Sequence, residues 1–218
     1  MAPTAEAALL CGDPARALLL AQELLSEPRM SNHHRGLWGY RGETADGMPL
    51  TVHATGIGGP SAAIVLGELI GAGLRRAIRI GTCSSPDGSL SLGTAVVAAT
   101  AAPAGGGPLA PDRALTDALV AGGAGPAAAL ISLERPPPPD DGPLHIHGGP
   151  GASESAHGPF DLQTATLAGI AVDRGIRFAA TLAVADSDGV PLEDEALESV
   201  VLRLGRVAVG ALAADSQP

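Results

Sequence analysis

The chain has very few aromatic residues, which make up 2% of its 218 positions. Proteins that bind single-stranded nucleic acids use aromatic side chains on which bases stack, so this composition argues against that class. Positive charge is also scarce, with 13 Lys and Arg residues against 23 Asp and Glu residues and a net charge of −10. We therefore expect no nucleic-acid partner and no anionic membrane surface as a partner, and any anion site has to be a local exception.

Cysteines and long apolar runs are scarce as well. The two cysteines, Cys11 and Cys83, lie in apolar strand-like runs without a CxxC pair, which predicts reduced core thiols in a cytosolic protein. No apolar run approaches the roughly 20 residues that cross a bilayer. The start of the chain, MAPTAEAALLCGDP, lacks the positive and long apolar regions of a signal peptide. We expect a cytoplasmic protein.

Short apolar runs alternate with helix-like stretches along the chain. The strand-like runs are residues 7–11, 50–54, 77–80, 95–99, 128–133 and 179–185, and the helix-like stretches are residues 14–25, 60–72, 112–120, 160–173 and 193–213. Apolar strands that alternate with helices are typical of an α/β fold with a largely parallel sheet. No internal repeat is present, and we expect one domain over residues 1–218.

One segment departs from this pattern. Residues 134–159 are rich in Pro, Gly and Ser, which predicts a surface loop with little buried area. The loop holds His145, His147 and His157, and the H-x-H spacing raises the question of a metal. No third ligand has a suitable spacing, so we expect an ordinary exposed loop and no metal site.

The first strand-like run ends in a turn that suits an anion. In LLCGDPARALLL, Asp13 is suited to the N-cap and Pro14 to the first turn of a helix. Gly12 can bring its backbone close to a ligand, and Arg16 lies in the first turn of that helix. Free N–H groups and an arginine at a helix start form an anion site. A well-capped helix without a ligand explains the same residues.

Two further strand ends carry polar groups. Arg79 interrupts an apolar run and is followed by Gly81 and Thr82. A buried arginine needs a partner, which is either a carboxylate or a bound phosphate. Asp186 follows an apolar run, where α/β proteins collect ligands, but on its own it also fits a turn, and Asp188 precedes a glycine and is typical of a turn. The TGIGGPS loop lacks the GxGxxG spacing, which argues against a nicotinamide or flavin cofactor.

These motifs, in this order, resemble the nucleoside phosphorylase superfamily, and within it the uridine phosphorylases. The resemblance rests on GDPAR, HHR, ATGIGGPSAAI, IRIGTC and FDLQTATLAGIAVDRGIR. It implies a three-layer α/β/α sandwich around a mixed, partly barrel-like sheet, and a homo-oligomer that is at least a dimer and can be a hexamer. It also implies that inorganic phosphate attacks the sugar and that no cofactor is needed.

The resemblance assigns roles to individual residues. Gly12, Arg16, Arg79 and Thr82 would bind phosphate, and Arg35 resembles the arginine that a neighbouring subunit contributes to the same phosphate. Asp186 matches the catalytic aspartate of the purine members, with Arg79 as the second catalytic residue. Contacts to the nucleoside are expected from residues 160–163, namely Phe160, Asp161, Leu162 and Gln163.

The nucleoside half departs from the family. Family members carry Glu-Met-Glu where this chain has Asp161, Leu162 and Gln163, and the second glutamate grips the ribose hydroxyls. Gln163 can hydrogen-bond hydroxyls but carries no charge. We predict that the protein cleaves a nucleoside with phosphate and releases a base and a sugar 1-phosphate. The nucleoside is a pyrimidine nucleoside or a modified or purine nucleoside. A hydrolytic nucleosidase and a catalytically weak paralogue that binds a nucleoside or phosphate stay open as alternatives.

Overall fold

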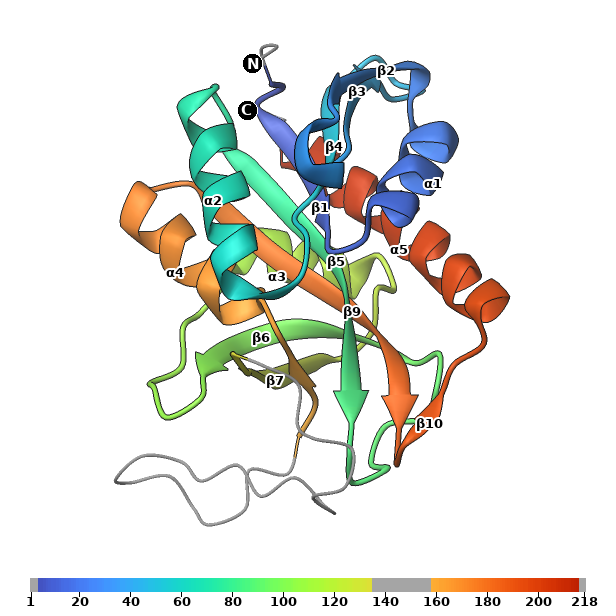
Figure 1. Cartoon of the computed structure of the whole chain (residues 1–218), viewed down its shortest axis with the longest axis vertical. Coiled ribbons are helices and arrows are strands. Elements are labelled where there is room, and N and C mark those ends of the chain that lie inside the picture. The colour runs from blue at the N-terminus through green and yellow to red at the C-terminus, as the bar shows by residue number, and fades with distance from the viewer. Residues whose placement is uncertain (1–3, 135–157, 216–218) are drawn as a thin grey trace.

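A continuous sheet of ten strands runs through the part of the chain that the structure describes, residues 4–134 and 158–215 of a computed structural model (Figure 1). Its strands are β1 (Ala7–Cys11), β2 (Ser26–Asn32), β3 (Gly39–Glu43), β4 (Pro49–Ala54), β5 (Arg76–Ser85), β6 (Ala95–Pro103), β7 (Ala127–Ser132), β8 (Phe160–Asp161), β9 (Arg177–Ser187) and β10 (Val190–Pro191). The helices are α1 (Pro14–Leu24), α2 (Gly58–Gly71), α3 (Arg113–Ala121), α4 (Thr164–Arg174) and α5 (Asp194–Ala214), with a 3-10 turn η1 at His34–Gly36.

Part of the sheet closes on itself. The strand order is β10-β9-β6-β7-β8-β5-β1-β4-β3-β2, and β9 also pairs with β5. Strands β5, β9, β6, β7 and β8 therefore form a closed ring, and β1, β4, β3 and β2 extend from it. The pairings β1–β4, β1–β5 and β5–β9 are parallel, whereas β6–β9 is antiparallel. This confirms the expected mixed, partly barrel-like sheet.

Alternate residues of the central strands face two separate cores. In β1, Leu9 and Cys11 pack into the core that is covered by α1, α3 and α5, whereas Ala8 and Leu10 pack into the core that is covered by α2 and α4. Side chains alternate between the two faces of a strand, so an unbroken apolar run fills both cores. The result is the expected three-layer sandwich, with helices on both faces of the sheet (Figure 1).

Most predicted elements are confirmed, with shifts at their ends. The run at 77–80 belongs to a strand that continues to Ser85, so Thr82 lies inside the strand and not at its end. Pairing with β9 continues along this segment and holds it extended. The helix expected from residue 160 begins at Thr164 instead. The carboxylate of Asp161 accepts hydrogen bonds from the backbone N–H groups of Gln163 and Thr164, which fixes the helix start at that point.

The polar strands were not predicted. Strand β2 has the sequence SEPRMSN and is mostly exposed, so it lacks the apolar alternation by which a strand is recognised. The histidines of the Pro/Gly-rich loop, residues 145, 147 and 157, lie outside the described residues, and so does most of that loop. The two cysteines are free and buried, as expected.

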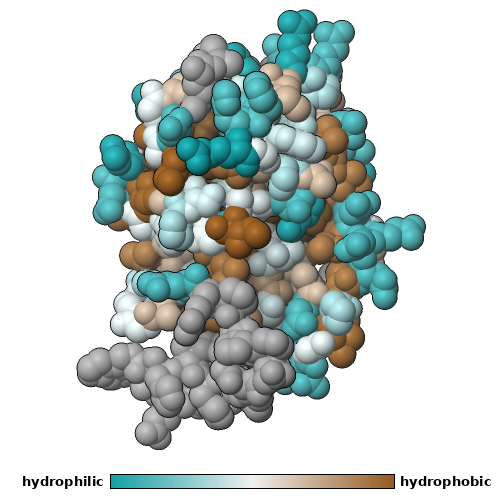
Figure 2. Space-filling view, in the orientation of Figure 1, coloured by the Kyte–Doolittle hydropathy of each residue, from teal (hydrophilic) through white to brown (hydrophobic). Residues whose placement is uncertain are grey.

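The surface is mixed in character. Figure 2 shows polar side chains over much of one face, with apolar side chains in small groups between them. Among the large apolar side chains of the described residues, Ile57 is the most exposed, at 86%. None of the helices in the described ranges has the length and hydropathy that a membrane crossing requires.

Candidate functional site

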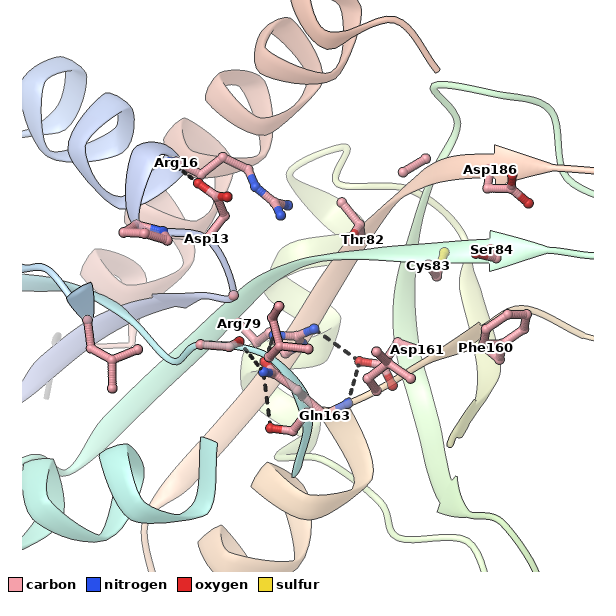
Figure 3. Close-up of a pocket in the computed structure, with 18 of the residues that line it drawn as sticks. Asp13, Arg16, Arg79, Thr82, Cys83, Ser84, Phe160, Asp161, Gln163 and Asp186 are labelled. Carbon is pink, nitrogen blue, oxygen red and sulfur yellow. Dashed lines mark hydrogen bonds and ion pairs between the residues drawn. The ribbon is translucent and has the colours of Figure 1, made fainter. Parts of the chain in front are cut away.

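A pocket of about 890 Å³ opens where β1, β5 and β9 meet the loops that follow them (Figure 3). All the site residues predicted from the sequence line this pocket; they are Gly12, Arg16, Arg35, Arg79, Thr82, Phe160, Asp161, Leu162, Gln163 and Asp186. The parallel strands β1, β5 and β9 end at the same edge of the sheet. This is the edge at which α/β proteins bind their ligands. The roles of the pocket residues toward a ligand stay predictions.

The turn after β1 forms one wall of the pocket. Asp13 is the N-cap of α1, and its Oδ1 accepts a hydrogen bond of 2.9 Å from the backbone N–H of Arg16. The Nη1 of Arg16 is buried and has no hydrogen-bond partner among the described residues. Figure 3 shows the guanidinium of Arg16 pointing from the start of α1 into the pocket. A buried donor without an acceptor is costly, so this atom is suited to an anion.

The glycine loop, residues 56–58, forms a second wall. Gly56 and Gly58 have φ values of 75° and 81°, a backbone conformation that residues other than glycine rarely adopt. A Cβ on Gly12 would lie 3.3 Å from the carbonyl oxygen of Gly56, so the turn after β1 and this loop are in close contact. Ile57, between the two glycines, lines the pocket. Ile57 was not among the predicted site residues, although its place between two glycines was a signal.

Arg79 is buried at the base of the pocket and has three partners. Its Nη2 lies 3.1 Å from Asp161 Oδ2, its Nη1 donates to Gln163 Oε1 at 2.6 Å, and its Nε donates to Thr164 Oγ1 at 3.2 Å. The ion pair is the carboxylate alternative that the sequence left open for this arginine. A guanidinium has five N–H groups, so the three contacts leave two of them for other partners. Phosphate binding by Arg79 stays a prediction.

Asp161 is the centre of a buried hydrogen-bond network, and its side chain is fully buried. Besides the ion pair, it accepts hydrogen bonds from Ser132 Oγ at 2.5 Å and from Thr164 Oγ1 at 2.6 Å. The backbone N–H groups of Gln163 and Thr164 also donate to it. A carboxylate with this many donors is held rigidly, so it fixes Arg79 and the start of α4 relative to each other.

The charges around the pocket are balanced in number. Three arginines, Arg16, Arg35 and Arg79, line it together with three aspartates, Asp13, Asp161 and Asp186. Since Asp161 neutralises Arg79, the charges that remain in the lining are Arg16 and Arg35 together with Asp13 and Asp186. The three arginines that were assigned to phosphate therefore do not give the lining a positive excess by number.

Arg35 lies in η1, with φ 58° and ψ 21°, and is exposed. It lines the pocket of its own chain. The contribution of Arg35 to a neighbouring subunit stays a prediction.

The remaining wall comes from β5, β8 and β9. Ser84 pairs with Phe160 on one side and with Asp186 on the other. Asp186 is the second-last residue of β9, and the turn follows at Asp188, whose φ is 51°. This confirms the turn at Asp188 and places the Asp186 carboxylate at the pocket. In Figure 3, Thr82 lies between Arg16 and Asp186.

Burial affects the thiols next to the pocket. Burial raises the pKa of both Cys11 and Cys83 to about 12, because a thiolate is poorly solvated in the protein interior. Cys83 also lines the pocket. Both thiols are protonated at neutral pH and are poor nucleophiles. Across the described ranges, no group of three or more His, Cys, Asp or Glu side chains is arranged to hold a metal ion.

Comparison with known proteins identifies the family. Residues 6–140 match the model of the phosphorylase superfamily. The match covers more than half of the chain, so the chain belongs to this superfamily, and the expected nucleoside phosphorylase fold and family are confirmed.

Individual relatives share shorter segments. A purine nucleoside phosphorylase DeoD-type from Oceanobacillus iheyensis is 43% identical over 82 residues, which are 37% of this chain and 34% of that protein. Proteins of the same name from Caldanaerobacter subterraneus and Bacillus thuringiensis are 40% and 38% identical over 98 residues, 44% of this chain and 42% and 41% of theirs. The matched segments thus span less than half of these relatives. They carry purine names, so they do not support the particular likeness to uridine phosphorylases.

Proposed function

We propose that the chain is a nucleoside phosphorylase. Inorganic phosphate attacks C1′ of the sugar, the bond from C1′ to the base nitrogen breaks, and its electron pair leaves with the base. The products are a free base and a sugar 1-phosphate. Purine nucleosides are the first candidates because the similar relatives carry that name, and pyrimidine nucleosides remain the alternative.

The observation that carries this proposal is the buried, unpartnered Nη1 of Arg16 at the start of α1. A helix start adds backbone N–H groups and a positive dipole end. Phosphate would supply the acceptor that this nitrogen lacks in the described structure. Gly12 and Thr82 line the same region and add a backbone group and a hydroxyl.

The roles of the other residues follow from the charge that develops during the reaction. The phosphate must be held close to C1′ in one orientation, and several donors accomplish this. The sugar becomes cationic in the transition state and is stabilised by the phosphate, whereas the leaving base becomes negative. Asp186 is the acidic side chain that we assign to the base, which it would assist through a proton or hydrogen bond.

A nucleoside panel tests the proposal. Each purine and pyrimidine nucleoside is incubated with and without phosphate, and the released base is measured by chromatography. We expect release that depends on phosphate, and a loss of about a hundredfold or more in kcat/KM for Arg16→Ala, the scale seen when one transition-state donor is removed. The matched control is Arg113→Ala, since Arg113 is exposed and is not among the residues that line the pocket. Equal release without phosphate would instead identify a hydrolytic nucleosidase.

A second candidate is a paralogue that binds a nucleoside or phosphate with little turnover. The observation that favours it is the ion pair between Arg79 and Asp161, which uses part of the positive charge of the pocket internally. Calorimetry that detects binding of phosphate and a nucleoside, together with no base release for any nucleoside, would support this candidate over the first.

We also propose that the protein is a homo-oligomer in which Arg35 reaches a neighbouring pocket. Its exposure and its position at the pocket lining are compatible with this role. Light scattering should give at least a dimer. A monomer at working concentration would contradict the proposal.

A further inference from the structure

The side-chain amide of Gln163 faces protein partners on both its oxygen and its nitrogen. Its Oε1 accepts from Arg79 Nη1 at 2.6 Å and from Thr55 Oγ1 at 2.9 Å. Its Nε2 donates to the carbonyl oxygens of Gly56 at 2.5 Å and Gly58 at 3.2 Å. An amide offers two N–H groups and two lone pairs, and Gln163 is only 2% exposed. In this arrangement both N–H groups are used, and Oε1 faces two protein donors, Arg79 and Thr55.

The chemistry of the partners fixes the orientation of this amide. The two carbonyl oxygens need donors, so the NH₂ group must face the glycine loop. The guanidinium of Arg79 needs an acceptor, so the oxygen must face β5 (Figure 3). The Oγ1 of Thr55 also lies 3.0 Å from the carbonyl oxygen of Cys11, so its single hydroxyl proton is shared between that carbonyl and Gln163 Oε1 and links the amide to the end of β1.

The segments that meet at this amide, the glycine loop and the part of β5 that carries Arg79, both line the pocket. Gly56 and Gly58 are in left-handed conformations, and the loop between them carries the exposed Ile57, which buries little apolar area itself. The position of the glycine loop therefore depends on hydrogen bonds such as those that Gln163 donates to Gly56 and Gly58. Arg79 is held by the same amide from the opposite side.

We propose that Gln163 is a positioning residue, which locks the glycine loop and Arg79 together and does not grip the substrate. The identity of the anion in this inference rests on the proposed function, whereas the lock does not. A glutamate could still accept from Arg79 and Thr55. It has no N–H group for Gly56 and Gly58, and its second oxygen would be repelled by their carbonyls. Glutamine at this position therefore closes a link that glutamate cannot close.

The test uses two variants that separate the halves of the lock. Gln163→Glu keeps the acceptor toward Arg79 and removes both donors toward the loop, whereas Gln163→Met removes all four contacts. The control is Thr181→Val, because Thr181 is fully buried, bridges the carbonyls of Val96 and Ala124, and does not line the pocket. Amide hydrogen exchange by mass spectrometry is followed over residues 55–61, and inorganic phosphate binding is measured by calorimetry.

We expect loop exchange to accelerate about tenfold or more in both Gln163 variants, as the loss of two buried hydrogen bonds allows. Phosphate affinity should fall about tenfold in Gln163→Glu and further in Gln163→Met, because only the second also releases Arg79. Thr181→Val should lower overall stability with loop exchange unchanged. Where Gln163→Met does not fold, Thr55→Val, which removes one donor to the amide, should still accelerate loop exchange, to a smaller extent.

Two results would overturn the inference. One is loop exchange at the wild-type rate in both Gln163 variants. The other is stronger phosphate binding and faster turnover in Gln163→Glu, which would mean that position 163 faces the substrate. If the wild type releases no base from any nucleoside but loop exchange accelerates as expected in the Gln163 variants, the proposed function fails and the positioning role stands.

Discussion

Replacing Asp161 by Asn leaves the shape of the site intact and removes one buried charge. The asparagine oxygen can still face Arg79 and Thr164, and its NH₂ then faces Ser132 Oγ, which can turn to accept. The hydrogen bonds are therefore largely kept, and what is lost is the negative charge opposite a guanidinium whose side chain is only 5% exposed. Breaking a buried pair by removing one charge costs about 3–5 kcal/mol.

Because the hydrogen bonds largely remain, we expect the lower end of that range, a loss of about 3 kcal/mol in the free energy of unfolding. For a chain of this length that corresponds to a fall of about 6–12 °C in Tm. The assay is urea unfolding followed by circular dichroism, with calorimetry for Tm. Asp117→Asn is the control, because Asp117 pairs with Arg113 in an exposed i,i+4 pair, which contributes well under about 1 kcal/mol.

A double-mutant cycle with Arg79→Met completes this test. If the pair is coupled as its geometry indicates, the double variant should be less destabilised than the sum of the single variants by more than about 1 kcal/mol. A loss below about 1 kcal/mol in Asp161→Asn, together with additive effects, would refute the reasoning, since Arg79 would then be stabilised without its carboxylate.

Three further outcomes can be checked by simple measurements. Gly81→Ala should destabilise the fold by about 1–3 kcal/mol in urea unfolding, because a Cβ there would lie 2.9 Å from the guanidinium beside it; Gly67→Ala, where the space is open, should be neutral or stabilising. A hydrogen bond from Arg177 lowers the pKa of Asp112, so the charged carboxylate stabilises the fold above about pH 4, and this contribution is lost as the pH falls through the folded-state pKa. In Asp112→Asn, the free energy of unfolding should therefore fall less steeply at acid pH than in the wild type. Cys11 and Cys83, with pKa values raised to about 12, should react with a thiol reagent at pH 8 only after unfolding, and fast labelling of the native protein would contradict their burial.

The parts of the fold that the sequence predicted are the ones with a strong periodic signal. The apolar run of β1 and the Asp-Pro start of α1 define their elements locally, and both are confirmed. Strand β2 pairs with the next strand along the chain but is polar, so it has no apolar alternation. Strand β8 has only two residues and pairs with β5 and β7, which are distant in the sequence. Neither strand has a local sequence pattern that predicts it without knowledge of the sheet to which it pairs.

The same limit applies to the site. The residues around the pocket were located by two signals: Gly12 and Arg16 lie where a strand ends and a helix begins, whereas Arg35 and residues 160–163 came from the family resemblance. It could not show that Gln163 and Asp161 are occupied by neighbours, because that depends on the distances to Arg79, Thr55 and Gly56 in three dimensions. Their ability to contact a ligand was therefore judged from residue type alone.

The short strand β8 has a consequence for folding and opening. It closes the ring through a single residue pair with β5, Ser84 with Phe160, and through two pairs with β7. Since the two sides of this seam are far apart in the sequence, the entropic cost of closing it is high and its formation is expected late in folding. Asp161 lies in the seam, so each transient separation there also removes the counter-charge of Arg79. The rate at which the seam opens thus sets how often the pocket loses its internal balance of charge, and a ligand that is held on both sides of the seam would slow that opening.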